Sequence, residues 1–134
     1  MIPSLRVLET VRDGCGPLHG LSREELLAQN IADLAGGRSR WVEMADGDAV
    51  AIILDHPELG FCQVHLCCTG GPRLFLAATR ELHRRAAELT EQPCAVACVG
   101  SSLARILARN GWRRANGVAP EGYEWWALSV HERH

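Results

Sequence analysis

The stretch from Phe61 to Trp112, which reads FCQVHLCC, TGGPR, LFLAATRELHRRAAELTEQ, PCAVACVG and SSLARILARNGW, decides the fold. Its apolar runs at 61–68 and 94–99 are typical of strands, and the residues between them repeat at helical spacing. We therefore expect strand, Gly-rich turn, long helix, strand and helix. A strand that continues through a helix to a second strand forms a right-handed crossover and a parallel pair. The turn at 69–72 then lies at the carboxyl end of the first strand, where α/β proteins usually bind ligands.

The residues before this stretch predict a short strand, a loop and a helix. Leu5 to Glu9 is expected to form the strand, and Thr10 to Gly20, which contains three glycines and a proline, the loop with one helical turn at most. Ser22 is a typical N-cap, because Glu25 can reach back to its backbone amide. Gly36-Gly37 is expected to end this helix.

A hairpin is expected next, and a last strand closes the chain. The hairpin joins strands at 41–45 and 49–54 through Asp46-Gly47-Asp48, and its second strand is apolar at every position, as in a strand covered on both faces. In the second half, Ser101 or Ser102 is expected to cap the helix that follows the 94–99 strand. Residues 123–130 are expected to form the last strand.

Composition limits the possible functions. The chain has 134 residues, 47% of them hydrophobic, which predicts one domain spanning 1–134. A net charge of −2 disfavours nucleic acid and anionic membranes as partners. All 14 basic residues are Arg, so the chain has no lysine for Schiff-base chemistry or a P-loop. Without a recognisable leader or an apolar span, we expect a soluble cytoplasmic protein with six reduced cysteines.

The order of the predicted elements resembles that of the acyl-CoA N-acyltransferase superfamily, called GNAT. The resemblance is strongest from Leu66 to Trp112. RLFLAATREL at 73–82 and LARILARNGW at 103–112 look most like a small GNAT-like family of tailed phages and prophages, which includes an internal virion protein. The resemblance implies an α/β fold with a mixed central sheet, flanking helices and a split between two parallel strands.

The resemblance also implies a cofactor site. In active GNAT members, the turn after the fourth strand holds the CoA pyrophosphate with backbone amides and a helix N-terminus, which together attract an anion. The matching turn is Thr69-Gly70-Gly71-Pro72-Arg73, so acetyl-CoA would contact Thr69, Gly70, Gly71 and Arg73. The spacing departs from the family pattern Gln/Arg-x-x-Gly-x-Gly/Ala, and Pro72 removes one amide donor. As a pyrophosphate cradle the turn is weakened.

Two further positions depart from the active members. Those proteins often carry an Asn just after the fifth strand and, on the next helix, a Tyr that protonates the leaving thiolate. Gly100 and Leu107 stand at the matching positions and can do neither job. Acetyl transfer would need another acid, such as Tyr123, or water.

The general base can come from Glu58, His65 or Glu43, directed toward the sheet centre, where GNAT enzymes usually place one. The alternative interpretation is that Glu58 is a solvated loop carboxylate and His65 a hydrogen-bonded strand residue. Arg73, Arg80 and Arg84 lie on one side of the long helix, either as an anion-binding stripe or as a solvated face.

Cysteines and tryptophans leave other interpretations open. Cys94 and Cys98 share one strand face, and the neighbouring strand carries Cys62, Cys67 and Cys68, so a zinc site is conceivable. The spacing is not that of a C-x-x-C knuckle, which favours core packing. Cys67 and His65 share a strand face, so a thiol nucleophile remains a minor hypothesis. Trp125 and Trp126 face opposite sides of their strand, and the exposed one favours a protein interface.

The sequence leads to two main hypotheses. The first is a GNAT-fold protein with a degenerate CoA turn that acts as a structural or accessory protein of a phage or prophage, with virion proteins or further copies of itself as partners. The second is an active N-acetyltransferase that moves an acetyl group from acetyl-CoA to a small amine or a protein N-terminus. A third possibility is a small-molecule binding module that uses the same cleft. No metal is expected.

Overall fold

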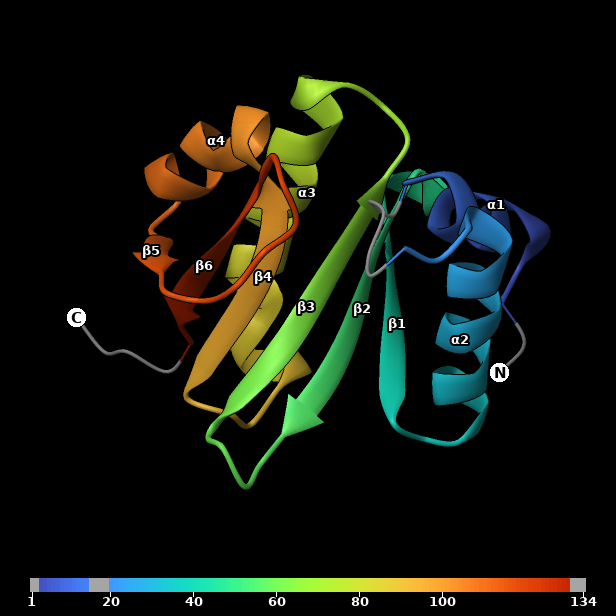
Figure 1. Cartoon of the computed structure of the whole chain (residues 1–134), viewed down its shortest axis with the longest axis horizontal. Helices are drawn as coiled ribbons and strands as arrows, with labels where there is room; N and C mark the ends of the chain where they lie inside the picture. Colours follow the sequence, from blue (N-terminus) through green and yellow to red (C-terminus); the bar gives the residue numbers. More distant parts are fainter. Residues whose placement is uncertain (1–2, 15–19, 131–134) are drawn as a thin grey trace.

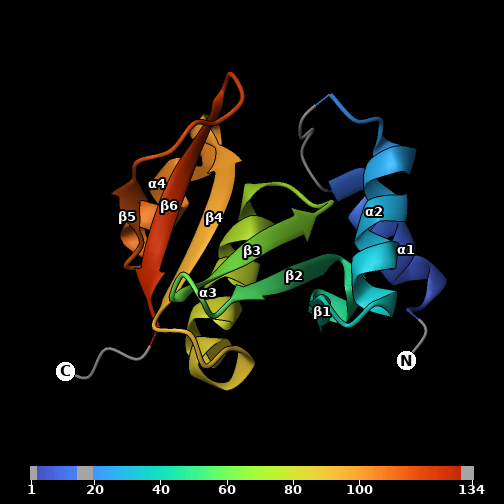
Figure 2. The same ribbon diagram turned by 60° about the horizontal axis from the view of Figure 1, so that its bottom comes forward.

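A computed structural model of the chain describes residues 3–14 and 20–130, which form a mixed six-stranded sheet with helices on both faces (Figures 1 and 2). The strands are β1 (Ser39–Met44), β2 (Ala49–His56), β3 (Phe61–Cys68), β4 (Cys94–Gly100), β5 (Arg113–Ala115) and β6 (Tyr123–Ser129), in the spatial order β1-β2-β3-β4-β6-β5. The α-helices are α1 (Leu5–Gly14), α2 (Arg23–Ala35), α3 (Pro72–Leu89) and α4 (Ala104–Arg109). The predicted α/β fold class is confirmed.

The parallel pair β3–β4 is joined over only three residue pairs. These are Phe61 with Cys94, Cys62 with Ala95, and Gln63 with Val96. By contrast, β3 pairs with β2 along its whole length, and β4 pairs with β6 along its whole length. Beyond Gln63 and Val96 the two strands diverge, which leaves a split that opens at their carboxyl ends (Figure 1). The predicted parallel neighbours are therefore confirmed.

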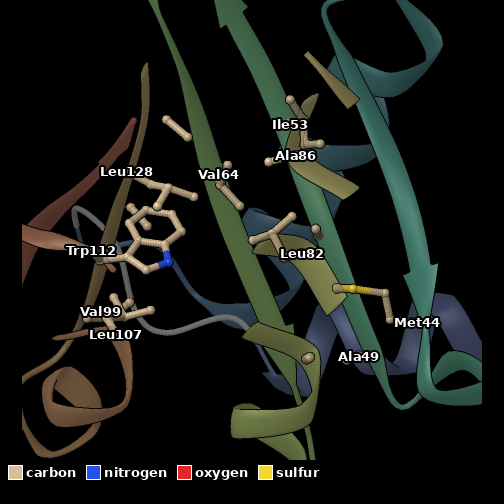
Figure 3. Packing of buried hydrophobic residues seen from close by; sticks show 14 of the residues in the cluster. Met44, Ala49, Ile53, Val64, Leu82, Ala86, Val99, Leu107, Trp112 and Leu128 are labelled. Carbon is tan, nitrogen blue, oxygen red and sulfur yellow. The ribbon is translucent and has the colours of Figure 1, made fainter. Parts of the chain in front are cut away.

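The larger core lies between the sheet and the helices α3 and α4. Apolar side chains of α3 at helical spacing, among them Phe75, Ala78, Leu82 and Ala86, pack on inward-facing residues of β2, β3 and β4 (Figure 3). Leu107 of α4 and Trp112 join the same cluster and are almost completely buried. This layer fixes α3 under both halves of the sheet and so positions the split.

The helices α1 and α2 lie on the opposite face, next to β1, β2 and β3 (Figure 2). Val50 and Ile52 of β2 point into this second core, together with Val7 and Val11 of α1. Ala49, Ala51 and Ile53 point to the other side, toward α3. The expectation that this apolar strand is covered on both faces is confirmed.

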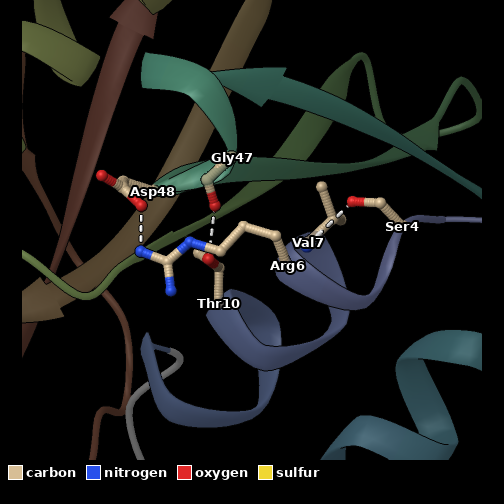
Figure 4. A network of polar contacts seen from close by, with 6 residues as sticks. All are labelled: Ser4, Arg6, Val7, Thr10, Gly47 and Asp48. Carbon is tan, nitrogen blue, oxygen red and sulfur yellow. Dashed lines mark hydrogen bonds and ion pairs between the residues drawn. The ribbon is translucent and has the colours of Figure 1, made fainter.

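The expected first strand at Leu5 to Glu9 is wrong, because these residues belong to α1. The Ser4 hydroxyl accepts a hydrogen bond from the Val7 backbone, which caps the helix (Figure 4). Val7 and Val11 lie four residues apart on the buried face, and the Thr10 hydroxyl between them donates to the Gly47 carbonyl. Five residues were too few to separate helical from strand periodicity.

One helix start was predicted correctly and one was not. Ser22 and Glu25 form the full capping box at the start of α2, and Gly36 follows its last residue as expected. Neither Ser101 nor Ser102 caps α4. They belong to a 3-10 turn, Ser101–Leu103, which leads into α4 without a side-chain cap. None of the described helices is long and apolar enough to cross a membrane.

Because α1 ends directly against β3, Gly14 is a sensitive test of this packing. A Cβ atom at Gly14 would lie 2.5 Å from the backbone nitrogen of Cys68. We expect Gly14→Ala to lower the free energy of unfolding by about 1–3 kcal/mol, the usual cost of forcing extra volume into a packed site. Urea unfolding followed by circular dichroism measures this.

Gly100→Ala is the matched control. At Gly100 φ is −61°, and the nearest atom to an added Cβ is the Ser102 hydroxyl oxygen at 3.9 Å, so alanine fits without strain. This variant is expected to be neutral or slightly stabilising. Equal stability of the two variants would contradict the packing of α1 on β3.

Candidate functional site

The turn between β3 and α3 lies at the open end of the split, at the carboxyl end of β3 (Figure 1). Gly71 is the N-cap of α3 and Pro72 is its first residue, a position where the missing proline N–H costs the helix nothing. The Thr69 backbone N–H donates to the Asp48 carbonyl at 3.3 Å, which ties the turn to the start of β2. The turn is therefore anchored on one side and opens into the split on the other.

The two glycines of the turn have different roles. A Cβ at Gly70 would lie 2.5 Å from Cδ2 and 2.9 Å from Cβ of Leu74, so only glycine fits there. The Gly70 backbone also makes a hydrogen bond to the Cys68 side chain. Burial raises the pKa of the Cys68 thiol, and this hydrogen bond opposes the rise. The Gly70 amide is thus engaged within the protein.

Gly71 and Arg73 leave donors available to a ligand. The amides of Leu74 and Phe75 donate to the Gly71 carbonyl at 3.1 and 3.2 Å, whereas those of Gly71 and Arg73 meet no acceptor among residues 3–14 and 20–130. A Cβ at Gly71 would have no atom within 4 Å, so the space in front of it is open. The α3 dipole and the exposed Arg73 guanidinium add positive potential. These groups fit an anion such as a pyrophosphate.

His65 is two residues beyond the last parallel-paired residue of β3, where the strands begin to part. Its Nε2 lies 2.9 Å from Nε2 of Gln63, two residues earlier on the same strand face. With the imidazole proton on Nδ1, His65 Nε2 accepts a hydrogen bond from the Gln63 amide. Burial lowers the pKa of His65, and the Asp33 carboxylate opposes that shift. The side chain is therefore a neutral group at pH 7.

Tyr123 lies at the open end of the other half of the sheet. In the antiparallel pairing of β4 with β6 it is opposite Gly100, the last residue of β4. The ends of β3 and β4 form the mouth of the split, so Tyr123 and the Gly70–Gly71 turn lie at the same end of the molecule. Leu107 points into the core, with 2% of its surface exposed, so its position offers no proton donor.

The structure does not bring the two predicted carboxylates to this end. Glu58 is in the β2–β3 turn, at the paired end of the split, with its Oε1 3.9 Å from His56 Nδ1 and 68% of its side chain exposed. Seven residue steps along β3 separate that turn from the mouth, or about 23 Å. Glu43 is on the edge strand β1, two strands away from β3. The solvated-loop interpretation of Glu58 agrees with its position.

The cysteines do not form a cluster. Cys62 and Cys68 face α3, whereas Cys94 and Cys98 face the other side of the sheet. These four are free thiols, but Cys67 is disulfide-bonded, which corrects the expectation of six reduced cysteines and removes Cys67 as a nucleophile. In the described part of the chain, no group of three or more His, Cys, Asp or Glu residues can hold a metal ion.

Comparison with known proteins points in one direction. No protein-family model matches the sequence, and no curated protein matches it significantly. Solved structures do match. A GNAT-family acetyltransferase from Bacillus anthracis superposes with a TM-score of 0.62 over 96% of this chain and 92% of its own, at 10% identity. A spermidine N-acetyltransferase mutant from Vibrio cholerae gives 0.62 over 94% and 88%, at 9% identity. A GNAT-family protein from Bordetella pertussis gives 0.59 over 92% and 88%, at 14% identity.

The chain has the GNAT fold. At these identities the likeness concerns the arrangement of elements, including the parallel pair and the helix that follows it. The sequence prediction of this fold, made from element order, is therefore confirmed at the level of the superfamily's architecture. The comparisons contain nothing that supports the narrower phage or virion family.

Two parts of the site were missed at the sequence level. Gln63 holds His65, and its spacing of two residues on one strand was a readable signal. The loop 116–122 folds back on Trp125, whose indole N–H donates to the Val118 carbonyl at 2.9 Å. Nothing in the sequence of that loop indicated this contact.

The lowered pKa of His65 makes stability depend on pH. The unfolded chain binds a proton at His65 at a higher pH than the folded chain does, so protonation favours unfolding. This contribution to stability is fully present above about pH 6.5 and is lost as the pH falls through the folded pKa. We expect His65→Gln to lose less free energy of unfolding than the unmutated protein between pH 7.5 and 5.0, measured by urea unfolding. If both proteins lost the same free energy of unfolding over this pH range, His65 would not be the source of the pH dependence.

Proposed function

We propose that the chain is an acetyl-CoA-dependent N-acyltransferase that acetylates a primary amine or a protein N-terminus. The observation that carries the proposal is the split between β3 and β4, with the free amides of Gly71 and Arg73 at its mouth. The structural likeness to a GNAT-family acetyltransferase and to spermidine N-acetyltransferase supports it.

In this proposal the turn and the first part of α3 hold the phosphates of CoA. Gly71 and Arg73 donate their backbone N–H groups, and the Arg73 guanidinium and the α3 dipole add attraction. Thr69 positions the turn through its bond to Asp48, and Gly70 lets Leu74 approach. When bound, the cofactor supplies the acetyl group and a thiolate leaving group.

The distribution of charge supports an anionic ligand in this half of the chain. Residues 72–115 contain eight arginines and three acidic residues, whereas residues 1–71 contain five arginines and ten acidic residues. All five arginines of the first part make ion pairs with Asp residues. In the second part, six make none within the described residues; they are Arg73, Arg80, Arg84, Arg105, Arg109 and Arg113. Their positive field attracts a polyanion such as CoA toward α3 and α4.

His65 and Tyr123 are the proposed base and acid. As the amine nitrogen bonds to the acetyl carbonyl carbon and the carbon–sulfur bond breaks, one amine proton goes to Nε2 of His65, the ring nitrogen that carries no proton, once it has released the Gln63 amide. The hydroxyl of Tyr123 gives its proton to the departing sulfur. Both groups return to their starting states by proton exchange with water, so the reaction consumes neither. Glu58 has no role in this scheme, because it lies at the other end of the split.

The second candidate is a GNAT-fold accessory protein of a phage or prophage that does not turn over CoA. Three observations favour it. Pro72 removes one amide from the turn, and Leu107 is buried where active members carry an acid. Large apolar side chains are also exposed, with 72% of Leu5 and 65% of Leu59 accessible, as in proteins that contact partners. Thermal shift with acetyl-CoA separates the two candidates, because ligand at 100 times Kd stabilises by about 2.7 kcal/mol.

Gly71 offers a sharp test of the phosphate contact. Its φ of −69° is compatible with proline, its N–H has no acceptor in the described chain, and the space around a Cβ is open. Gly71→Pro is expected to fold normally but to lose one of the two free amides. Loss of a hydrogen bond to a charged group weakens binding by about 1.5–3 kcal/mol, so the acetyl-CoA Kd should rise about tenfold to a hundredfold by isothermal titration calorimetry.

The matched control is Gly71→Ala, which adds a methyl group to the same open space and keeps the N–H. It should bind acetyl-CoA within about threefold of the unmutated protein, since no hydrogen bond is lost. Equal affinities for the alanine and proline variants would remove the Gly71 amide from the proposed phosphate site. Failure of the unmutated protein to bind millimolar acetyl-CoA would favour the accessory-protein candidate.

Tyr123→Phe tests the proposed acid, because only the hydroxyl is removed from a partly exposed side chain. General acid catalysis contributes about 10² to 10⁴ in rate, so kcat should fall by at least about a hundredfold while the Kd for acetyl-CoA stays the same. Product formation is followed by mass spectrometry, with calorimetry for the cofactor. Unchanged kcat would assign the proton to water instead.

A further inference from the structure

One face of the second half of the sheet carries no helix among the described residues. Both α3 and α4 lie on the opposite face, and α1 and α2 lie over β1, β2 and β3 (Figures 1 and 2). Alternate residues of β4 are accordingly half-exposed on this open face and buried on the other. The open face begins at β3 beside the split and continues across β4 and β6. A molecule in contact with it reaches the place where β3 and β4 part.

The side chains on this face follow from the strand register. Gln63 and His65 of β3 share the face with Val96 of β4, because Gln63 and Val96 are paired. Val96 and Cys98 are opposite Ala127 and Trp125 of β6, and Tyr123 follows at the open end. The face therefore presents the following side chains beside the split: Gln63, His65, Val96, Cys98, Tyr123, Trp125 and Ala127.

The loop 116–122 forms a rim on this face by holding Trp125. The Trp125 indole N–H donates to the Val118 carbonyl at 2.9 Å. A Cβ at Gly117 would lie 2.8 Å from Trp125 Cδ1, so the loop backbone packs directly on the indole ring. The Val118 side chain at the loop tip is 99% exposed. A fixed indole and an exposed aliphatic side chain are suited to a flat apolar ligand.

No carboxylate of β3, β4, β5 or β6 faces this side. Asp33 of α2 acts on His65 from outside these strands, and its Oδ1 lies 3.0 Å from Nε of Arg38. Glu124 of β6 points to the opposite side, where its carboxylate accepts from the Trp126 indole at 3.0 Å and pairs with Arg114 at 3.3 Å.

Burial shifts the pKa values of two groups on this face toward their uncharged forms, lowering that of His65 and raising that of the Cys98 thiol. Arg113 of β5, opposite Ala127, adds a positive charge at the edge of the face. A protonated amine that leaves water needs a carboxylate to replace its hydration, and none is present on these strands.

We propose that the acceptor is an aromatic amine, uncharged at neutral pH, whose ring stacks on Trp125 while its amino group reaches His65. This inference rests on the proposed acetyl transfer and names its substrate class. An arylamine is unprotonated at neutral pH because its lone pair is conjugated with the ring, so it reaches His65 without losing an ionic hydration shell. A polyamine such as spermidine, the substrate in the name of one structural relative, carries several charges with no partner here.

The test measures amine and cofactor binding separately. Binding of 4-methylaniline and of spermidine is measured without cofactor by ligand-observed NMR, and acetyl-CoA binding is measured by calorimetry. The proposal expects 4-methylaniline to bind at least about tenfold more tightly than spermidine, the size of one aromatic contact. Spermidine binding as tightly as 4-methylaniline, or no binding of 4-methylaniline, overturns the proposal.

Failure of acetyl-CoA to bind overturns the proposed function and is a different result from either amine outcome. Trp125→Leu removes the ring but keeps an apolar side chain. This variant is expected to raise the Kd for 4-methylaniline about tenfold. Its Kd for acetyl-CoA should be unchanged, which also shows that the variant is folded. Ser129→Ala, on the same strand face at the far end of β6, is the matched control. If both variants lower the affinity for 4-methylaniline equally, Trp125 is not the residue on which the amine stacks.

Discussion

The structure depends on the short parallel pairing of β3 with β4. Each strand is fully paired on its other side, β3 with β2 and β4 with β6, so each half of the sheet follows the twist of its own antiparallel partners. Only Phe61 to Gln63 still matches Cys94 to Val96 before the halves separate. Backbone groups inside a sheet are normally paired, so a split of this kind exposes polar groups that a ligand can satisfy.

The helix α3 keeps the split at one width. It connects the end of β3 to the start of β4 and packs under both, with Leu82 beside Val64 and other core residues on the same side of the sheet (Figure 3). Small residues lie where α3 comes close to β2, since Ala78 and Ala86 of α3 share one cluster with Ala49 and Ala51 of β2. The same helix presents its N-terminus at the mouth. One element therefore both packs under the opening and supplies the proposed anion site.

Much of the fold was predictable because its signals are local. The apolar run followed by Thr69-Gly70-Gly71 predicts the bounds of β3. The capping box predicts where α2 begins. The first helix was not predicted, because Val7 and Val11 reveal their helical spacing only with Thr10, which had been assigned to a loop. The extent of the β3–β4 pairing was also beyond the sequence, since it depends on how two sheet halves twist and not on any one residue.

The candidate site was harder to predict than the fold, because it depends on which strand ends lie together in space. His65 and the turn glycines lie on one strand and its end, so residue order was enough to bring them together. Glu58 is one of three candidate bases that the sequence offers, with a solvated loop carboxylate as the alternative interpretation. It precedes β3, so an eight-residue strand separates it from the mouth of the split. Residue type had suggested a base, but position along the strand decides whether a carboxylate reaches the mouth.

In the proposed mechanism the two halves of the sheet contribute different groups. His65 comes from β3 and Tyr123 from β6, so their separation is set by the width of the split and not by a shared strand. A change in the α3 core that moves one half would move the base relative to the acid. Since small displacements of reacting groups cost large factors in rate, the proposed acetyl transfer depends on the packing of α3 as well as on the side chains at the mouth.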